Sequence, residues 1–344
     1  MDKNLNIKVP VVSVVMSVFN GAKYLHEAIE SILSQTYTDL EFIIINDGST
    51  DNSEEIIKSF KDERIIYIPN KTNIGLIDSL NNGLKTARGK YIARMDADDI
   101  SVNNRIELQL KEFNENPAAI VVGSDYYLLS GSRLKHIKNR SNSDYQKAVL
   151  FFSPCFCHPT VMMKNIFREK NIFYNKEYVH AEDYKLWTEL SLYGDFLSVK
   201  EPLLKYRSHV SQISSNNKQA QLEVSKRIRV EFCNKLKFTL SDEQLATLNI
   251  IGNNTFITSL EVLTDIENCL LHLKEQNVQY KIFGESAFKI FLHKFWFDSC
   301  GNTNLGLLAY GTYSKSNLSK LIKVSLDKKS KLLTKCLIRR FKKA

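Results

Sequence analysis

Three aspartates, Asp96, Asp98 and Asp99, fall within four consecutive positions directly after the apolar run at residues 90–95. Carboxylates this close disfavour one another's ionisation, so the cluster favours a bound cation. Oxygen ligands in a loop suit Mg²⁺ or Mn²⁺, which also take substrate phosphates as ligands. The alternative is that Asp98 or Asp99 caps a helix expected to start near Val102, because aspartate is a favoured N-cap residue.

The segments around this cluster alternate between strand and helix patterns. Nearly continuous apolar runs predict buried strands at residues 11–19, 42–45, 64–68 and 90–95, and a helical pattern follows each of the first three. This order predicts a largely parallel sheet with right-handed crossovers. Ligands bind beyond the carboxyl ends of such strands. Because Asp47 and the three aspartates both follow strand ends, the pattern favours a nucleotide site.

The second half of the chain has a more mixed pattern. A strand is predicted at residues 120–123, a helix or strand at 145–152, and a helix that opens at Glu182 and Asp183. The polar run 211–221 is typical of a flexible link, and the pattern at 222–297 is mostly helical. We therefore predict an α/β domain at residues 1–221 and a helical extension at 222–344.

Composition narrows the class of protein. The 344 residues are 43% hydrophobic and 25% charged, which is ordinary for a soluble globular protein. No run of 18 apolar residues predicts a transmembrane helix, and residues 1–6 lack the apolar core of a signal peptide. The six cysteines are scattered, which favours reduced thiols in a cytoplasmic protein.

The positive charge is concentrated at the end of the chain. The net charge is +9, yet residues 315–344 alone carry nine Lys, two Arg and one acid. A nearly neutral main domain argues against nucleic-acid binding. Leucines such as Leu321, Leu326 and Leu337 lie on one side of a helix predicted at residues 318–341. A basic amphipathic helix suits an anionic membrane, here the inner face of the plasma membrane. The alternative is a solvated helix that covers the core.

Taken together, the motifs of the first 215 positions resemble the inverting glycosyltransferases of family 2, which share the GT-A fold. In order along the chain, the motifs are Asn20, DGSTD (47–51), NIG (73–75), ARGKYI (87–92), the aspartate cluster, EDYKLW (182–187) and YRSH (206–209). The resemblance implies a nucleotide-diphosphate sugar donor, most often uridine-based, and a divalent metal. It also implies a glycan or lipid-linked glycan acceptor, with bacterial surface-polysaccharide assembly as the setting.

On the donor side, Asp47 matches the acid that hydrogen-bonds the base, and its alternative role is that of a turn residue before Gly48. Phe19 stands where the family often has tyrosine, so it packs near the base or belongs to the core. Asn20 and Asn73 belong to motifs expected on the donor.

The aspartate cluster matches the acids that bind the metal and the ribose. The resemblance assigns Asp98 and Asp99 to Mn²⁺ or Mg²⁺, and spacing does not decide which of them touches the metal. Asp96 and Arg94 are expected beside the donor, with Asp96 orienting the other acids. Arg94 faces the diphosphate or forms a salt bridge to the same acids. His209 matches a histidine that completes the metal or diphosphate site, and its alternative is an exposed histidine.

On the acceptor side, the resemblance makes Asp183 the general base, ahead of Glu182. Inverting transfer needs one carboxylate to take the proton of the attacking hydroxyl, which contributes about 10²–10⁴-fold. The alternative is structural, because acids at a helix start are stabilised by capping and by the helix dipole. The motif at His158 also recurs in the family, and acceptor-side packing is the expectation for it.

Two other classes of protein remain as alternatives. One is another α/β nucleotide enzyme. A dehydrogenase is disfavoured because no Gly-x-Gly-x-x-Gly follows the first strand, whereas a sugar-phosphate nucleotidyltransferase stays open. The other is a non-catalytic nucleotide-sugar-binding protein on the same fold.

Overall fold

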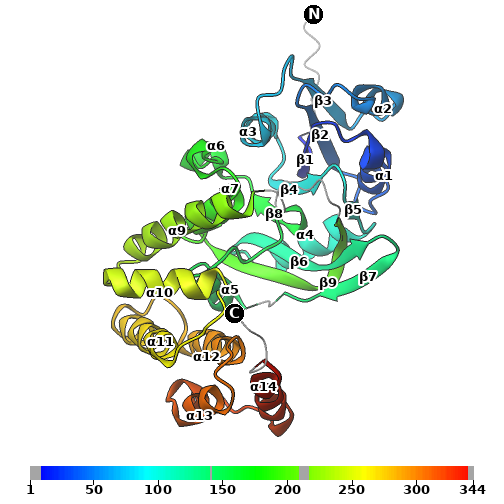
Figure 1. The fold of residues 1–344 in the computed structure, drawn as a ribbon. Helices are drawn as coiled ribbons and strands as arrows, with labels where there is room; N and C mark the ends of the chain where they lie inside the picture. Colours follow the sequence, from blue (N-terminus) through cyan, green and yellow to red (C-terminus); the bar gives the residue numbers. More distant parts are fainter. Residues whose placement is uncertain (1–8, 140–141, 209–216, 340–344) are drawn as a thin grey trace, which may run out of the picture. The chain divides into compact units, whose positions relative to one another are not determined.

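The computed structural model describes residues 9–139, 142–208 and 217–339 (Figure 1). The chain forms two compact units. The first contains residues 1–141 and 156–221, and the second contains 142–155 and 222–344. The domains 1–221 and 222–344 stay a prediction, and the compact units differ from them in the segment 142–155, which packs with the second unit.

The first unit is a curled mixed sheet with flanking helices. Its elements are β1 (Val12–Val18), α1 (Ala22–Leu33), β2 (Leu40–Asn46), α2 (Ser53–Ser59), β3 (Ile65–Pro69), α3 (Leu76–Thr86), β4 (Tyr91–Asp96), β5 (Ile100–Ser101), α4 (Arg105–Glu115), β6 (Ala119–Ser130), β7 (Arg133–Ile137), η1 (His158–Thr160), β8 (Met162–Lys164), α6 (Phe167–Lys170), η2 (Lys176–Tyr178), α7 (Glu182–Leu190) and β9 (Asp195–Arg207).

The strand order is β3-β2-β1-β4-β8-β6-β9-β5, with β7 paired to β6. The pairs β3–β2, β2–β1 and β1–β4 are parallel, as the alternating pattern of strands and helices predicts. The rest of the sheet is mixed. Strand β8 lies antiparallel between β4 and β6, and β5 pairs antiparallel with β9. The sheet is therefore parallel where the donor-side motifs lie.

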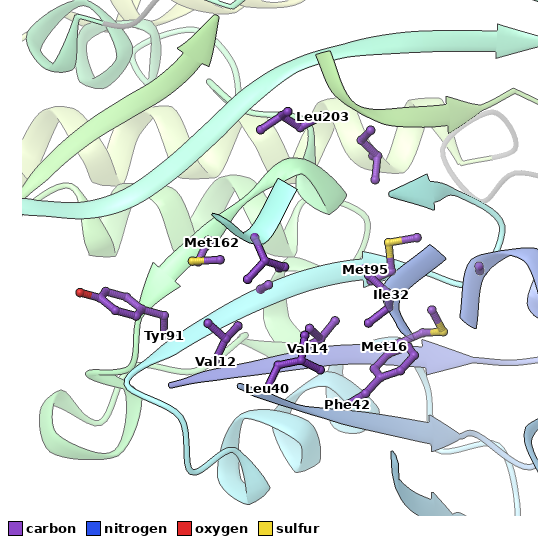
Figure 2. Packing of buried hydrophobic residues seen from close by; sticks show 14 of the residues in the cluster. Val12, Val14, Met16, Ile32, Leu40, Phe42, Tyr91, Met95, Met162 and Leu203 are labelled. Atoms are coloured by element: carbon purple, nitrogen blue, oxygen red, sulfur yellow. The ribbon is translucent and has the colours of Figure 1, made fainter. Parts of the chain in front are cut away.

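Strands β1, β2 and β4 are buried on both faces along almost their whole length, which explains their continuous apolar runs, whereas β3 is only half-buried. Val12, Val14 and Met16 of β1 point into a cluster that also contains Phe42 of β2 and Ile32 of α1 (Figure 2). The side chains between them face the opposite way, toward α3. There a Cβ on Gly83 would approach Val15 to 2.4 Å, so only glycine lets α3 pack this closely. Helices α1 and α3 therefore cover opposite faces of the parallel strands (Figure 1).

The second unit is helical. It contains α5 (Ser143–Val149), most of α9 (Lys218–Lys235), α10 (Asp242–Gly252), α11 (Leu260–Tyr280), α12 (Glu285–Gly301), α13 (Leu307–Lys315), η3 (Leu318–Lys320) and α14 (Leu326–Arg339). Aromatic rings fill its core, where Phe151 contacts the rings of Phe232, Phe238 and Phe291. Residues 218–221, predicted as part of a flexible link, begin α9 instead, and 211–216 lie outside the described residues.

The C-terminal helix is shorter than the pattern predicts. The described chain has a short 3₁₀ turn at η3 and then α14, in place of one helix over residues 318–341. Leu318 is fully buried within the second unit, and residues 321–325 between η3 and α14 form no helix. Within the ranges that the structure describes, no helix is long and apolar enough to span a bilayer.

Candidate active site

The register of the parallel strands brings the sequence motifs to one edge of the sheet. Ser17 of β1 lies between Ile45 of β2 and Asp96 of β4. The residues that follow these strand ends therefore emerge side by side. They include Phe19 and Asn20 after β1, Asp47 after β2, and Asp98 and Asp99 after β4.

The three aspartates form a compact carboxylate cluster. One ligand oxygen from each of Asp96, Asp98 and Asp99 lies within 4.8 Å of the others. Neither Asp98 nor Asp99 caps the next helix, because α4 begins at Arg105 and its N-cap residue is Asn104. The capping alternative for these two acids is therefore wrong.

Asp99 is the most buried of the three acids, with 1% of its surface exposed. Its Oδ1 accepts a hydrogen bond from the Arg207 main-chain N–H at 2.8 Å. Its Oδ2 is buried and has no hydrogen-bond partner in the described structure. Burial, together with the charges of Asp96 and Asp98, raises the pKa of Asp99 well above its ordinary value. An unpartnered buried carboxylate oxygen is costly, and a bound cation would satisfy it.

Two buried arginines lie beneath this cluster. Arg94 is 3% exposed, and its guanidinium lies 2.5 Å from the Asp96 carboxylate. Arg94 therefore forms the salt bridge to the aspartates that the sequence offered as the alternative to a contact with the diphosphate. Arg105 is fully buried and donates to the carbonyl oxygens of Arg94 and Val161 at 2.8 and 3.1 Å. Burial lowers the pKa of Arg105 to about 10, so this guanidinium is protonated at neutral pH.

Asp47 organises the loop that follows β3. It is 2% exposed, and its Oδ1 accepts hydrogen bonds from Asn70 Nδ2 and the Ile74 N–H, both at 2.9 Å. Its Oδ2 accepts from the Gly75 N–H at 3.0 Å. Gly48 has φ +70°, and a Cβ there would come within 2.5 Å of the Thr72 main chain. The turn at Asp47 is therefore locked against residues 70–75.

The loop after β1 interlocks with the loop after β2. Asn20 has φ +51°, which directs its side chain toward the Thr50 main-chain N–H at 2.8 Å. The Asn20 N–H in turn donates to Ser49 Oγ at 3.0 Å. Asn73 accepts from the Gly75 N–H at 3.0 Å. Phe19 is 49% exposed, so it is a surface side chain and not a core residue.

Asp183 lies in the first turn of α7, which begins at Glu182 as predicted. The N-cap position is Ala181, without a side-chain cap, so Asp183 does not serve as the N-cap. Burial, and then the Glu182 charge, raises the pKa of Asp183 to about 7. The Tyr184 N–H donates to Asp183 Oδ1 at 2.7 Å, which fixes the direction of the carboxylate.

The buried Cys157 thiol is influenced electrostatically both by Asp183 and by two acids of the aspartate cluster. Burial raises the pKa of the Cys157 thiol well above its ordinary value, and the charges of Asp99, Asp96 and Asp183 add to this rise. Arg94 acts electrostatically on these same three acids. The two sets of acids that the sequence singled out therefore belong to one electrostatic site.

The sequence predicted no role for Tyr174, and only acceptor-side packing for His158. His158 Nε2 lies 2.7 Å from the Tyr174 hydroxyl, and the His158 ring packs against Trp187 of α7. Burial lowers the pKa of His158 well below its ordinary value, so the imidazole is neutral. Asn81 of α3 holds the Tyr174 main chain with two hydrogen bonds, of 2.8 and 3.0 Å. Nothing in the local sequence at Tyr174 signals this pairing. His209 lies outside the described residues.

This fold is similar to solved structures of the GT-A class. The crystal structure of S. aureus TarS 1–349 in complex with UDP-GlcNAc matches with a TM-score of 0.58 and 16% sequence identity, over 84% of this chain and 88% of that one. A structure of the longer S. aureus TarS matches with a TM-score of 0.54. The similarity shows the GT-A fold, a mixed α/β sheet to which helices are added at the C-terminal end.

Sequence comparison gives the family. A family model described as "Glycosyl transferase family 2" matches residues 13–172. A glycosyltransferase of Haemophilus influenzae is 40% identical over 237 residues, 64% of this chain and 73% of that protein. Another, of Methanocaldococcus jannaschii, is 34% identical over 276 residues, 75% of this chain and 94% of that protein. The chain belongs to glycosyltransferase family 2 and is a glycosyltransferase.

Proposed function

We propose that this glycosyltransferase moves one sugar, with inversion, from a uridine-diphosphate sugar to a hydroxyl of a glycan or lipid-linked glycan, and that it needs a divalent metal. One observation carries the proposal. Three carboxylates lie within 4.8 Å of one another where the parallel strands end, and the buried Oδ2 of Asp99 has no partner in the described chain. Asp183, a second acid with a raised pKa, is proposed to act at the same site.

The aspartate cluster fits Mn²⁺ or Mg²⁺. Its donors are carboxylate oxygens, which these hard cations prefer, and no imidazole or thiolate is needed among the described ligands. Asp98 and Asp99 are the residues that would hold the ion, while Arg94 keeps Asp96 in place beside them. The bound ion would supply positive charge next to the diphosphate as the sugar leaves. His209 is proposed as an additional ligand on the basis of the family motif.

The donor-binding residues are proposed from their positions at the same edge of the sheet. Asp47 already accepts three hydrogen bonds from its own chain, and a carboxylate has about four acceptor positions. One position on Oδ2 therefore remains for an N–H of the base. Phe19 offers an exposed ring on which a base can stack, and the loops of Asn20 and Asn73 border the same region.

Asp183 is proposed as the general base. The acceptor oxygen attacks the anomeric carbon from the face opposite the diphosphate, so the new C–O bond forms as the bond to the diphosphate breaks. Asp183 takes the proton of the attacking hydroxyl. A pKa of about 7 suits this task, because a base works best when its pKa is close to the working pH. The Tyr184 N–H fixes the direction of the carboxylate.

Contact with a membrane is part of the proposal, because a lipid-linked acceptor lies at one. Helix α14 exposes Leu326 (84%) and Ile338 (62%), while Leu332 and Cys336 are buried in its own unit. Exposed Lys328, Lys329 and Lys331 lie on the same helix. A basic helix with exposed apolar side chains suits an anionic membrane surface. Surface-polysaccharide assembly is the proposed setting, by analogy with the family.

Donor hydrolysis tests the proposal. A panel of nucleotide sugars is incubated with the protein and Mn²⁺, and release of the nucleoside diphosphate is measured. We expect hydrolysis of a uridine-diphosphate sugar that stops on chelation and in Asp98→Ala. Activity that survives both changes would contradict the metal role. Pyrophosphate release from a nucleoside triphosphate would instead indicate a nucleotidyltransferase, and binding without turnover would indicate a non-catalytic protein.

A further inference from the structure

The loop that carries Asp98 and Asp99 runs directly into a short strand pair. Ile100 and Ser101 of β5 pair with Lys205 and Leu204 of β9, and the Val102 N–H donates to the Leu203 carbonyl at 3.0 Å. If this antiparallel register continued for two more residues, Asp98 would lie opposite Arg207. At that point main-chain pairing gives way to bonds made by side chains.

Arg207 bonds to both aspartates where the strand pair ends. Its main-chain N–H donates to Asp99 Oδ1 at 2.8 Å, and its guanidinium Nε donates to the Asp98 carbonyl at 2.8 Å. In a continued strand pair, the Arg207 main-chain N–H would donate to the Asp98 carbonyl. Here the Arg207 side chain makes that hydrogen bond, and the main-chain N–H donates to Asp99 Oδ1 instead. The other oxygen of Asp99, Oδ2, is buried and has no partner in the described structure, so it can bind a ligand.

The guanidinium is held from its other side by α1. Its Nη2 lies 2.6 Å from Glu27 Oε2, and the guanidinium lies 4.3 Å from the centre of the Tyr24 ring. The Arg207 side chain is 16% exposed, whereas Glu27 is 55% exposed. An exposed ion pair contributes little to the free energy of unfolding. Its role here is geometric, because Glu27 and Tyr24 fix the plane of the Arg207 guanidinium, which bonds to Asp98.

We propose that Arg207 is a positioning residue for the Asp98–Asp99 loop: it sets these carboxylates in place for a divalent cation and a nucleoside diphosphate before either binds. This inference rests on the proposed function, since it names what the cluster binds. Groups that orient metal ligands commonly change metal affinity by about 10–100-fold when they are removed. Arg207 acts through Asp98 and Asp99, and no contact of its own with the donor is required.

The test compares Arg207→Met with Arg64→Met. Arg64 also bonds an aspartate and a main-chain carbonyl, Asp62 and Leu33, at the start of β3 and away from the aspartate cluster. Titration calorimetry measures the affinity for uridine diphosphate with and without Mn²⁺, and thermal denaturation measures folding. We expect Arg207→Met to weaken Mn²⁺-dependent binding at least about tenfold, and Arg64→Met to leave it within about twofold. Arg207→Met affinity within twofold of wild type would overturn the inference.

Glu27→Gln provides a milder variant in case Arg207→Met does not fold. It leaves both bonds between Arg207 and the aspartate loop intact and removes only the charge that holds the guanidinium. Losing an exposed ion pair of this kind should weaken Mn²⁺-dependent binding about threefold, with unchanged unfolding temperature. Wild-type affinity would count against the inference. If the wild-type protein itself binds no uridine diphosphate with Mn²⁺, the proposed function fails. If it binds and the variants match it, only the role of Arg207 fails.

Discussion

The guanidinium of Arg94 lies 2.5 Å from the carboxylate of Asp96 and is almost completely buried beneath the aspartate cluster. Arg105 also acts electrostatically on Asp96 and Asp99, yet the pKa values of both acids stay above their ordinary value. Burial is the largest cause of this rise, and the charges of the neighbouring aspartates add to it. Such an arrangement costs stability in the metal-free protein, and this cost supports the proposal that the cluster binds a cation.

Asp183→Asn should separate binding from transfer. The amide keeps the size of the side chain but cannot accept the proton of the acceptor hydroxyl. We expect donor binding close to wild type and a loss in transfer rate of about 10²–10⁴-fold. Steady-state kinetics with donor and acceptor, together with calorimetric titration of the donor, measures both quantities. Unchanged turnover would exclude Asp183 as the base.

The rate should depend on the ionisation of Asp183. Because this carboxyl has a pKa of about 7 and must be deprotonated to act, transfer should rise with pH through about pH 7 and then level off. The Glu182 charge contributes to that pKa, so Glu182→Gln should move the rise to lower pH and keep turnover. A Glu182→Gln variant that loses transfer while Asp183→Asn keeps it would reverse the assignment.

Asp99→Asn should stabilise the metal-free protein at high pH. The folded-state pKa of Asp99 is raised, so the native state holds a proton that the unfolded state releases above about pH 4. The free energy of unfolding of the wild type therefore falls as the pH rises from that point. Removing the charge should add at least about 1 kcal/mol at pH 8 and little at pH 4.

Asp125→Asn provides the matched control for this stability measurement. Asp125 is also buried, but it accepts hydrogen bonds from the Asn139 N–H at 2.7 Å and from His136 at 2.8 Å. Its replacement should therefore destabilise the protein, by about 1–3 kcal/mol. Urea denaturation in a metal-free buffer measures both variants. A loss of stability at pH 8 in Asp99→Asn would show that Asp99 is a satisfied structural carboxylate.

Helix α14 should bind anionic vesicles. Sedimentation with phosphatidylglycerol vesicles should remove the protein from solution at low salt and release it at high salt. Lys328→Glu combined with Lys331→Glu should abolish sedimentation. The control is Lys71→Glu with Lys90→Glu, which changes the charge equally at exposed sites on the first unit. Equal loss in both double variants would indicate a general charge effect and not an α14 site.

The sequence predicted the parallel half of the sheet because β1 and β2 are buried on both faces, which gives continuous apolar runs at residues 11–19 and 42–45. It also predicted that Asp47 and the aspartate cluster meet at one edge, since parallel strands end together. The insertion of β8 between β4 and β6 was not predictable, because a three-residue strand has too little pattern to be recognised.

The contacts that orient the side chains of the site were also not predictable from the sequence. Arg207 reaches Asp98 and Asp99 across more than 100 positions, and Tyr174 is tied to Asn81 across 93. Such pairs depend on the final packing of distant elements, and no local rule of spacing detects them. The family motif included Arg207 but gave it no role. The aspartates were recognisable because three acids within four positions already indicate a cation site.

The central claim is that the aspartate cluster binds a divalent cation and, through it, the diphosphate of a donor. Calorimetric titration of uridine diphosphate into wild type and Asp98→Ala, each with and without Mn²⁺, tests it most directly. We expect tight binding only for wild type with Mn²⁺, and weak binding in the other three titrations. Binding of equal strength in all four would contradict it.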